Sequence, residues 1–304
     1  MTAKRDPDLS IIIANYNAKE MLNGCLESIY HHPPMCTFEV FVVDDASSDG
    51  SYQMVQRNFP QVRLLRNEQN LHYSKSNNRA LELAQGRYIC LLNNDTVILP
   101  NALATMMNFL DQHPQVGAVG SRLLNADGTI QASVKALPSI RSGLFGAQSI
   151  IIKLFPTNRF SRQELLHLCH DMRKPFQAGY VSGASTMIRK RVIEQIGYLD
   201  ERMFYHVDAD YCKRIWDAGW EIFYLPDSTV IHFNHQGGTL INRKRRFKSI
   251  FEFHRGYYIY FRKHLYKSPL NLLYFMTTIG IGLRFVVYLL IQFVKETKDS
   301  CKSW

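Results

Sequence analysis

EVFVVDDASSDGS, residues 39–51, gives the clearest structural signal in this 304-residue chain. An apolar run over Phe38–Asp44 ends in the paired carboxylates Asp44 and Asp45, and a polar turn then opens a helix-like segment. The run is continuously apolar, which is typical of a strand buried on both faces of a parallel sheet. Ser48 or Asp49 is placed to cap the helix. The stretch therefore predicts one strand–helix unit of an α/β fold.

The same pattern recurs on both sides of this unit. Further apolar runs cover Leu9–Tyr16, Val62–Arg66, Tyr88–Leu92 and Val116–Leu124. Helix-like segments with polar starts, such as Ala18–Tyr30 and Ser74–Gln85, lie between them. This order predicts a Rossmann-like, mostly parallel sheet flanked by helices on both faces. Such sheets bind ligands beyond the carboxyl ends of their strands, so the strand-end residues are the first candidates for a site.

Shorter elements are expected after an irregular segment at residues 136–176. The sequence predicts a strand over Tyr180–Ile188, helices over Arg189–Ile196 and Asp208–Ala218, and strands over Glu221–Leu225 and Thr229–Phe233. We therefore expect one domain over residues 1–240. Residues 244–266, with mixed charge and many aromatics, are predicted to be helical and to begin a separate C-terminal region over residues 241–304.

Charge is unevenly distributed along the chain. Residues 241–304 carry thirteen Lys or Arg against three Asp or Glu, which accounts for the whole net charge of +10. This basic tail contains many aromatics and, at Arg243–Arg246, a run of four cations. Because no nucleic-acid motif accompanies the charge, the tail favours an anionic membrane surface over nucleic acid.

An apolar stretch of 26 residues, Pro269–Val294, follows the basic segment. It is long enough to cross a bilayer core of about 30 Å. Arg284 lies in its middle, and a charge there is costly on a helix that faces lipid. The sequence therefore leaves two interpretations open, a membrane span and a helix that lies in the membrane plane or re-enters it.

The residues at two strand ends are candidates for binding a nucleotide or a metal ion. Asp44 and Asp45 can accept hydrogen bonds from a base N–H or a ribose hydroxyl, although a helix cap and an ordinary turn would have the same sequence. In LLNNDT, residues 91–96, an apolar strand gives way abruptly to Asn93, Asn94 and Asp95. Mg²⁺ prefers oxygen ligands and bridges one or two carboxylates to phosphates, so Asp95 is a candidate metal ligand. The alternative is a solvated turn.

Asp208 and Asp210 lie two residues apart at the start of a predicted helix, so they do not face the same side. We expect Asp208 to project into a cleft, while Asp210 caps the helix or pairs with Arg214. Both acids would also complement the helix dipole without any further role. His232 follows an apolar run and is either a structural histidine or a metal ligand.

Several classes of protein lose support because their motifs are missing. No GxGxxG follows the first strand, and neither a P-loop nor a GxSxG nucleophile motif is present. The six cysteines form no CxxC pair, which argues against a disulfide framework or structural zinc and is consistent with a reducing cytosol. The first ten residues lack the apolar core of a signal peptide.

These clusters, in this order, resemble family-2 glycosyltransferases of the GT-A fold, and most closely the bacterial rhamnosyltransferase-like branch that builds surface polysaccharides. The resemblance covers about residues 9–240. The matching segments are SIIIANYN (10–17), CLESI (25–29), EVFVVDDASSDGS (39–51), NLHYSKSNNRAL (70–81), GRYICLLNNDT (86–96), PNAL (100–103), PQVGAVGSRL (114–123), DGTIQAS (127–133), GASTMIRK (183–190), IGYLDERMF (196–204), DADYCKRI (208–215), GWEIFYLP (219–226) and VIH (230–232).

The resemblance implies an inverting, metal-dependent transfer of a sugar, with rhamnose suggested by the branch, from a dTDP- or UDP-sugar. The acceptor would be a hydroxyl of a lipid-linked or polysaccharide chain in cell-surface glycan synthesis. Residues 9–124 would be the nucleotide-binding half of the domain and residues 177–240 the acceptor and catalytic half. The enzyme would work at the cytoplasmic face of the inner membrane, held peripherally or by one C-terminal helix.

Roles also follow from the resemblance, position by position. Tyr16 would line the base, Asp44 and Asp45 would bind base and ribose, and Asn93-Asn94-Asp95 would occupy the DxD position. Asp95 would hold Mg²⁺ or Mn²⁺ with His232 as a further ligand, and Asp208 would be the general base. This sequence departs from the family pattern at Asn93, at Val207, where a glutamate is usual, and at His72, where a glycine is common.

Other functions remain as alternatives. A nucleotidyltransferase also places metal-binding acids at strand ends, but it needs a basic, glycine-rich loop that the segment IIIANYNAKE at residues 11–20 lacks. A non-catalytic nucleotide-sugar-binding membrane protein would keep the fold without needing Asp208. Binding of nucleic acid through the tail would show a steep dependence on salt.

Overall fold

The central sheet begins with five strands that the sequence predicts. The computed structural model describes residues 6–139, 166, 170–234, 243–266, 268 and 271–301, with only the backbone of residues 243–246 and 294–301 among them. The side chains of the basic run Arg243–Arg246 and most of the irregular segment at 136–176 lie outside this description. The five strands are β1 (Leu9–Asn15), β2 (Phe38–Asp44), β3 (Arg63–Arg66), β4 (Tyr88–Leu92) and β6 (Val116–Leu124).

Within the described residues, nine strands form one mixed sheet in the order β3-β2-β1-β4-β10-β6-β11-β5, with β8 (Phe176–Gln177) paired to β11. β1, β2, β3 and β4 are parallel, as predicted. β10 (Ser185–Arg189) is inserted antiparallel between β4 and β6, and β5 (Thr96–Ile98) is antiparallel to the end of β11. A second, two-stranded sheet joins β7 (Val134–Lys135) and β9 (Tyr180–Val181).

Two predictions for the C-terminal half were wrong. The single strand expected over Tyr180–Ile188 is divided into β9 and β10, because Ser182–Ala184 leave the extended path and the two pieces join different sheets. The two strands expected after residue 220 are one strand, β11 (Glu221–His232), with a register shift between Leu225 and Thr229 where Pro226 interrupts the ladder. That strand carries His232 to the edge of the sheet where the other strand-end residues lie.

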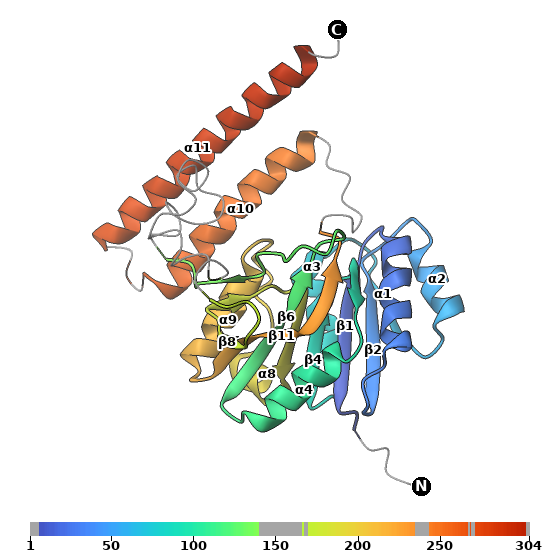
Figure 1. Ribbon diagram of the computed structural model, residues 1–304. Helices are drawn as coiled ribbons and strands as arrows, with labels where there is room; N and C mark the ends of the chain where they lie inside the picture. The colour runs from blue at the N-terminus through green and yellow to red at the C-terminus, as the bar shows by residue number, and fades with distance from the viewer. Residues whose placement is uncertain are drawn as a thin grey trace.

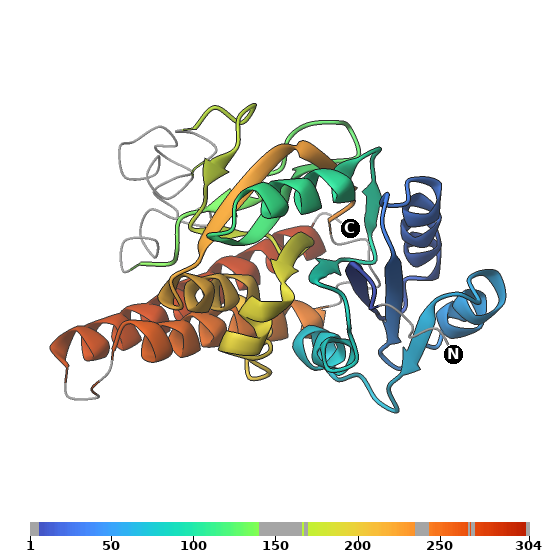
Figure 2. The same ribbon diagram turned by 90° about the horizontal axis from the view of Figure 1, so that it is seen from below.

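Helices cover both faces of the sheet (Figures 1 and 2). One core lies under α1 (Lys19–His31), α2 (Ser51–Asn58) and α4 (Ala102–Gln112), and the other under α3 (His72–Leu81), α8 (Lys190–Ile196) and α9 (Val207–Asp217). The sequence of β1 explains why the sheet has a core on each face. Its continuous apolar run sends Ile11 and Ile13 into the first core and Ile12 into the second.

The N-cap of α2 is Gly50 rather than the predicted Ser48 or Asp49, but the Asp49 carboxylate accepts hydrogen bonds at the starts of two helices. Asp49 Oδ1 accepts a hydrogen bond from the N–H of Ser51 at the start of α2, at 3.0 Å, and Oδ2 accepts one from the N–H of Lys19 at the start of α1, at 2.8 Å. Both helix starts offer unpaired N–H groups that a carboxylate satisfies. One side chain therefore fixes the loop after β1 relative to the loop after β2.

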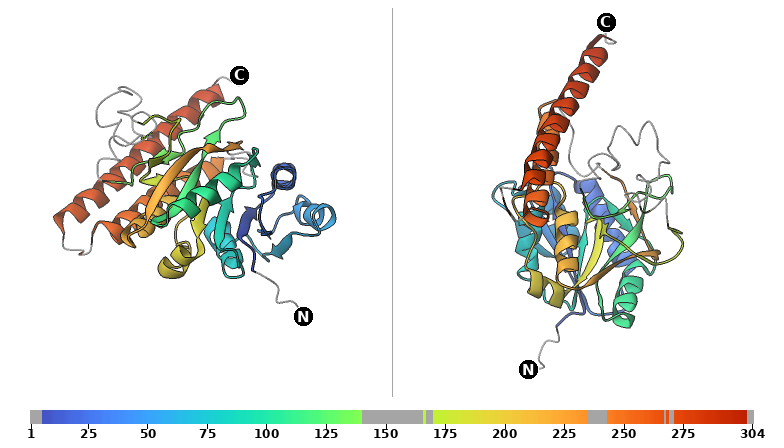
Figure 3. Two further views of the ribbon diagram at one scale, coloured as in Figure 1. Left: turned by 60° about the horizontal axis from the view of Figure 1, so that its bottom comes forward. Right: turned by 90° about the vertical axis from the view of Figure 1, so that its left-hand side faces the viewer.

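The C-terminal region forms two helices that lie side by side (Figures 1 and 3). α10 (Arg243–His264) buries Tyr260 and Phe261 in the second core, beside α9. α11 (Leu272–Cys301) runs back along α10 and is mostly exposed. Within the described residues, Leu272–Phe293 is the one helix long and apolar enough to cross a membrane, with a mean hydropathy of 1.8.

Candidate functional site

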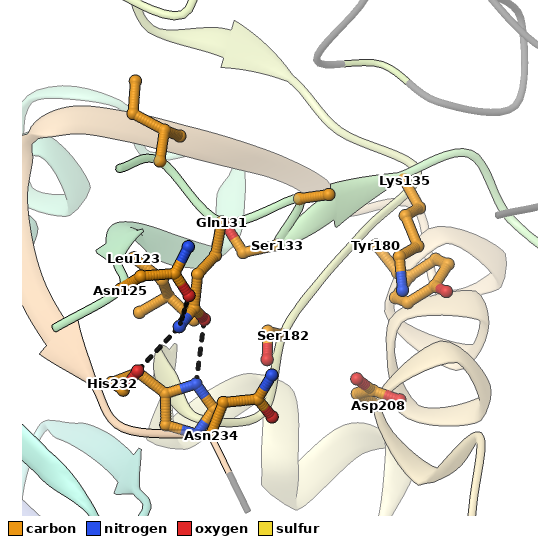
Figure 4. Close-up of a pocket in the computed structure, with 12 residues that line it drawn as sticks. Leu123, Asn125, Gln131, Ser133, Lys135, Tyr180, Ser182, Asp208, His232 and Asn234 are labelled. Carbon is orange, nitrogen blue, oxygen red and sulfur yellow. Dashed lines mark hydrogen bonds between the residues drawn. The ribbon is translucent and has the colours of Figure 1, made fainter. Parts of the chain in front are cut away.

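A cavity of about 390 Å³ opens at the edge of the sheet where the parallel strands end. It contains Asp208 from the first turn of α9 and His232 from the last residue of β11 (Figure 4). The remaining lining residues are Leu123, Asn125, Ile130, Gln131, Ala132, Ser133, Lys135, Tyr180, Ser182 and Asn234. Most of this lining is polar, and much of it comes from residues 125–135, which follow β6.

Asp44, at the end of β2, is buried and only partly satisfied. Its Oδ2 accepts a hydrogen bond from the Ser47 N–H at 3.2 Å and lies 3.8 Å from Arg66 Nε. Its Oδ1 has no hydrogen-bond partner among the described residues. A buried carboxylate oxygen without a partner is costly. Asp44 therefore offers a free acceptor at a strand end.

Both carboxylate oxygens of Asp45 accept hydrogen bonds from its own chain. Oδ1 accepts hydrogen bonds from Asn67 Nδ2 at 2.7 Å and from the Leu71 N–H at 2.8 Å, while Oδ2 accepts one from the His72 N–H at 2.9 Å. His72 starts α3 with a positive φ of 67°, a conformation that a side chain at this position disfavours. The carboxylate thus holds the backbone at the position where the resemblance led us to expect a glycine.

Asn94 joins two strand ends, and Tyr16 lies at the end of the first. Asn94 Nδ2 donates to Asn15 Oδ1 at 2.8 Å, which ties the loop after β4 to the last residue of β1. Tyr16 follows directly and is half-buried. The ends of β1 and β4, next to which Tyr16 and Asn94 lie, are therefore joined directly.

Asp95 and His232 form a direct pair at the end of β11. His232 Nε2 lies 3.3 Å from Asp95 Oδ1 and 3.4 Å from Asn93 Nδ2. On the other side of the ring, His232 Nδ1 is 3.0 Å from Gln131 Oε1 (Figure 4). Gln131 Nε2 donates to the His232 carbonyl at 2.6 Å, so the amide oxygen is the atom left to face the ring. The ring proton accordingly lies on Nδ1, and in a neutral imidazole Nε2 turns a lone pair toward Asp95.

This pair fits a divalent cation. In a neutral ring the Nε2 lone pair has the Asn93 amide at 3.4 Å as a donor but also faces the Asp95 oxygen at 3.3 Å, and a cation between nitrogen and oxygen would remove that repulsion. Adjacent ligands of an octahedral ion with bonds of about 2.1 Å are about 3 Å apart. Carboxylate oxygen and imidazole nitrogen are both ligands of Mn²⁺, and oxygen suits Mg²⁺. Across the described residues no third His, Cys, Asp or Glu completes a cluster, so further ligands would come from substrate and water.

Asp208 projects toward the cavity, as its spacing from Asp210 predicts, while Asp210 Oδ2 pairs with Arg214 Nε at 3.1 Å. Burial raises the pKa of the Asp208 carboxyl above its usual value. The positive charge of Lys135 and backbone N–H groups, including that of Ala209 at 3.0 Å, act in the opposite direction. A carboxylate with a raised pKa beside a polar cavity is suited to accept a proton.

Sequence reasoning missed three residues of this site: Gln131, Ser133 and Lys135. Gln131 orients His232, Ser133 Oγ is buried and has no hydrogen-bond partner among the described residues, and Lys135 lies on the Asp208 side of the cavity (Figure 4). All three follow β6 in a segment without hydrophobic periodicity. The only sequence signal was the matching segment DGTIQAS, which includes Gln131 and Ser133.

The fold is that of a GT-A glycosyltransferase. The structure is similar to a mannosyltransferase from Pyrobaculum calidifontis solved with GDP-Man and Mn²⁺, with a TM-score of 0.57, 16% identity, and coverage of 99% of this chain and 81% of that one. It is also similar to residues 1–349 of S. aureus TarS solved with UDP, with a TM-score of 0.51, 18% identity, and coverage of 86% of this chain and 67% of that one. These likenesses confirm the predicted fold class.

The family follows from the sequence. Residues 10–197 match the model of glycosyl transferase family 2, and the chain belongs to that family. A curated relative, the N-acetylglucosaminyl-diphospho-decaprenol L-rhamnosyltransferase of Mycobacterium tuberculosis, is 29% identical over 208 residues. The match covers 64% of this chain and 66% of the relative's length, just under two thirds. The chain is therefore a member of glycosyl transferase family 2, and the predicted likeness to the bacterial rhamnosyltransferase-like branch is confirmed.

Proposed function

We propose that this protein is an inverting glycosyltransferase that moves a sugar from a dTDP- or UDP-sugar to a hydroxyl of a lipid-linked acceptor. One observation carries the proposal. Asp208 and His232 line the same cavity, and His232 is in contact with Asp95. A candidate proton acceptor and one residue of a candidate cation-binding pair therefore line the same cavity, which supports a single displacement at a sugar carbon.

The donor would lie along the strand ends, with its base at the end of β2. Uracil and thymine both carry an N–H at ring position 3, and the unpaired Asp44 Oδ1 is an acceptor that this group can satisfy. Tyr16, beside it, would line the base, and Asn94 would hold the two strand ends in register. Asp45, whose oxygens are engaged by Asn67, Leu71 and His72, would act mainly by fixing the loop next to the donor.

Asp95 and His232 would hold Mg²⁺ or Mn²⁺ beside the diphosphate, with Asn93 next to them. When bound, the ion supplies positive charge that stabilises the departing diphosphate. The Gln131 amide, by accepting the Nδ1 proton of His232, would keep the Nε2 lone pair directed toward Asp95. Asp208 takes the proton of the acceptor hydroxyl as that oxygen attacks the anomeric carbon from the face opposite the diphosphate, so the configuration inverts.

The test is a panel of nucleotide sugars, each incubated with purified protein and a lipid-diphosphate acceptor, with and without Mg²⁺ or Mn²⁺. We expect one dTDP- or UDP-sugar to release its nucleotide only when acceptor and metal are present, with a product of inverted configuration by NMR. A retained configuration, or release of nucleotide from no donor, contradicts the proposal.

Lys135 would influence the pH range in which the enzyme is active, through the pKa of Asp208. Its charge favours the ionised form of Asp208, so Lys135→Met should raise the pKa of that carboxyl further. The base must be deprotonated to act, so the acidic limb of the kcat–pH profile should move to higher pH. Lys135→Arg should keep the wild-type limb. Lys190→Met, which removes a cation paired with Gln85 at the opposite edge of the sheet, serves as the control. An unmoved limb in Lys135→Met would show that Lys135 does not act on Asp208.

α11 supports a location at a membrane surface. Apolar side chains stay exposed along one stripe of this helix, including Leu272, Met276, Ile279, Leu283 and Leu290. Arg284 is turned to the other side, where its guanidinium lies 5.8 Å from the Phe253 ring and 5.5 Å from the Tyr257 ring of α10. Because α10 is packed on the catalytic domain, α11 would lie in the plane of the membrane, with its apolar stripe in lipid.

Removal of residues 271–304 should release the protein from membranes while α10 stays on the domain. We expect the full chain, but not the truncated one, to float with vesicles of neutral lipid in a density gradient, while vesicles that contain anionic lipid measure what the basic residues before residue 271 contribute. Flotation of the truncated protein with neutral vesicles would place the membrane contact elsewhere.

A further inference from the structure

The segment in front of Asp208 is held in a strained conformation. His206 precedes α9 with a φ of 64°, in the left-handed region that a non-glycine residue rarely adopts. Its carbonyl accepts the Asp210 N–H at 2.9 Å, so the same residue starts the helix that carries Asp208. Such a conformation persists only where the surroundings hold it.

α10 supplies those surroundings. The His206 ring packs against the Phe253 and Tyr257 rings, with centroid separations of 4.6 and 4.0 Å. Tyr205 Oη and Ser249 Oγ share a hydrogen bond of 2.6 Å. At Gly256 the two backbones approach so closely that a Cβ would lie 2.7 Å from the Tyr205 carbonyl oxygen and 3.0 Å from His206 Cδ2. Only glycine fits there without displacing residues 205 and 206.

The far end of α10 is fixed to the same helix. Lys263 Nζ and His264 Nε2 lie 2.8 and 2.7 Å from Asp210 Oδ1, and the Asp210 side chain is fully buried. Burial lowers the pKa of His206 to about 3, so the contact at the other end does not change its charge near neutral pH. α10 therefore contacts α9 in two places, at His206 just before the helix and at Asp210 in its first turn.

α11 braces α10 from outside. The Phe253 and Tyr257 rings that pack on His206 also face Arg284, which lies 5.4 Å from Tyr288 of its own helix as well. A hydrogen bond of 2.8 Å between the hydroxyls of Tyr258 and Tyr274 joins the two helices further along. The contacts form a continuous chain from α11 through the two rings to His206 and the helix of Asp208.

We propose that Gly256 and Arg284 are positioning residues, and that the α10–α11 hairpin holds the base in its catalytic orientation. The inference rests on the proposed role of Asp208 as the general base. The hairpin whose apolar stripe would lie in lipid would thus also orient the Asp208 carboxylate. Loss of the close packing would let residues 205–206 relax and move Asp208, without changing the donor site at the ends of β1, β2 and β4.

The experiment compares Gly256→Ala with Gly280→Ala in the full chain. Gly280 lies on α11, and a Cβ there would meet nothing within 4 Å. We expect Gly256→Ala to lower kcat by about 10- to 100-fold, since displacements of about 1 Å have effects of this size. The Kd for the nucleotide sugar should stay unchanged. The acidic limb of the kcat–pH profile should move to lower pH, because a displaced carboxyl is less desolvated. Gly280→Ala should behave as wild type.

Arg284 provides a second route if Gly256→Ala does not fold. Arg284→Gln should lower kcat with unchanged donor Kd, and Arg284→Lys, which keeps a cation over the rings, should restore most of it. Wild-type turnover in folded Gly256→Ala, or in Arg284→Gln, would overturn the inference while leaving the proposed function intact. A wild-type protein that transfers no sugar at all would instead overturn the proposed function and this inference with it.

Discussion

Asp208→Asn should lower kcat at least about 100-fold, which is the low end of the contribution of a general base. The amide occupies nearly the same volume but cannot take the proton of the acceptor hydroxyl. Donor binding should not change, because the strand-end residues that would hold the nucleotide are untouched. The measurements are kcat under saturating donor and acceptor, and the Kd of the nucleotide sugar by calorimetry.

Asp217→Asn is the matched control for this change. It lies on the same helix, α9, and its side chain is 54% exposed, where it forms a surface ion pair with Lys213. Such pairs contribute little to stability, so kcat and folding should both stay near wild type. Near-normal turnover in Asp208→Asn would remove Asp208 from the role of base.

Asp95→Ala should have an effect at least as large, together with a change in metal response. The charge that a bound cation supplies to a leaving diphosphate is worth several kcal/mol, and each 1.4 kcal/mol is tenfold in rate, so a loss of about 1000-fold or more is expected. The residual activity should no longer depend on Mg²⁺ or Mn²⁺. The measurement is the initial rate as a function of metal concentration.

His232→Ala distinguishes the two ligands of the pair. It should raise the metal concentration needed for half-maximal rate while leaving more activity than Asp95→Ala, because the carboxylate keeps its charge. If Asp95→Ala retained wild-type activity with an unchanged metal requirement, the cation would have to bind away from the Asp95–His232 pair.

The parallel half of the fold could be predicted closely because each buried strand is a continuous apolar run. β2, β4 and β6 have the predicted boundaries, and the polar residues after β2 and β4 lie at one edge of the sheet. The spacing of Asp208 and Asp210 likewise predicts opposite directions on a helix. In these cases local sequence and tertiary structure agree.

Other features depend on contacts between distant residues. The sequence around Asp45 does not show that its carboxylate accepts hydrogen bonds from the N–H groups of residues 71 and 72. The sequence around Gln131 likewise does not show that this side chain orients His232. Pro226 suggests a break in a strand, yet the structure accommodates it as a bulge. The sequence could not decide between a membrane span and an in-plane helix for the stretch around Arg284. The aromatic rings that pack on Arg284 belong to another helix, α10, so the stretch itself does not reveal them.

The position of β10 between β4 and β6 affects how the chain can fold during its synthesis. β6, completed by residue 124, pairs only with β10 and β11 among the described strands, and both are synthesised after residue 184. A nascent chain that has reached residue 150 would therefore display one open sheet edge, on β4, and a strand, β6, that lacks both of its native partners. Such edges recruit foreign strands and promote aggregation. We expect ribosome-bound fragments of this length to need a chaperone, and residues 9–124 alone to be insoluble.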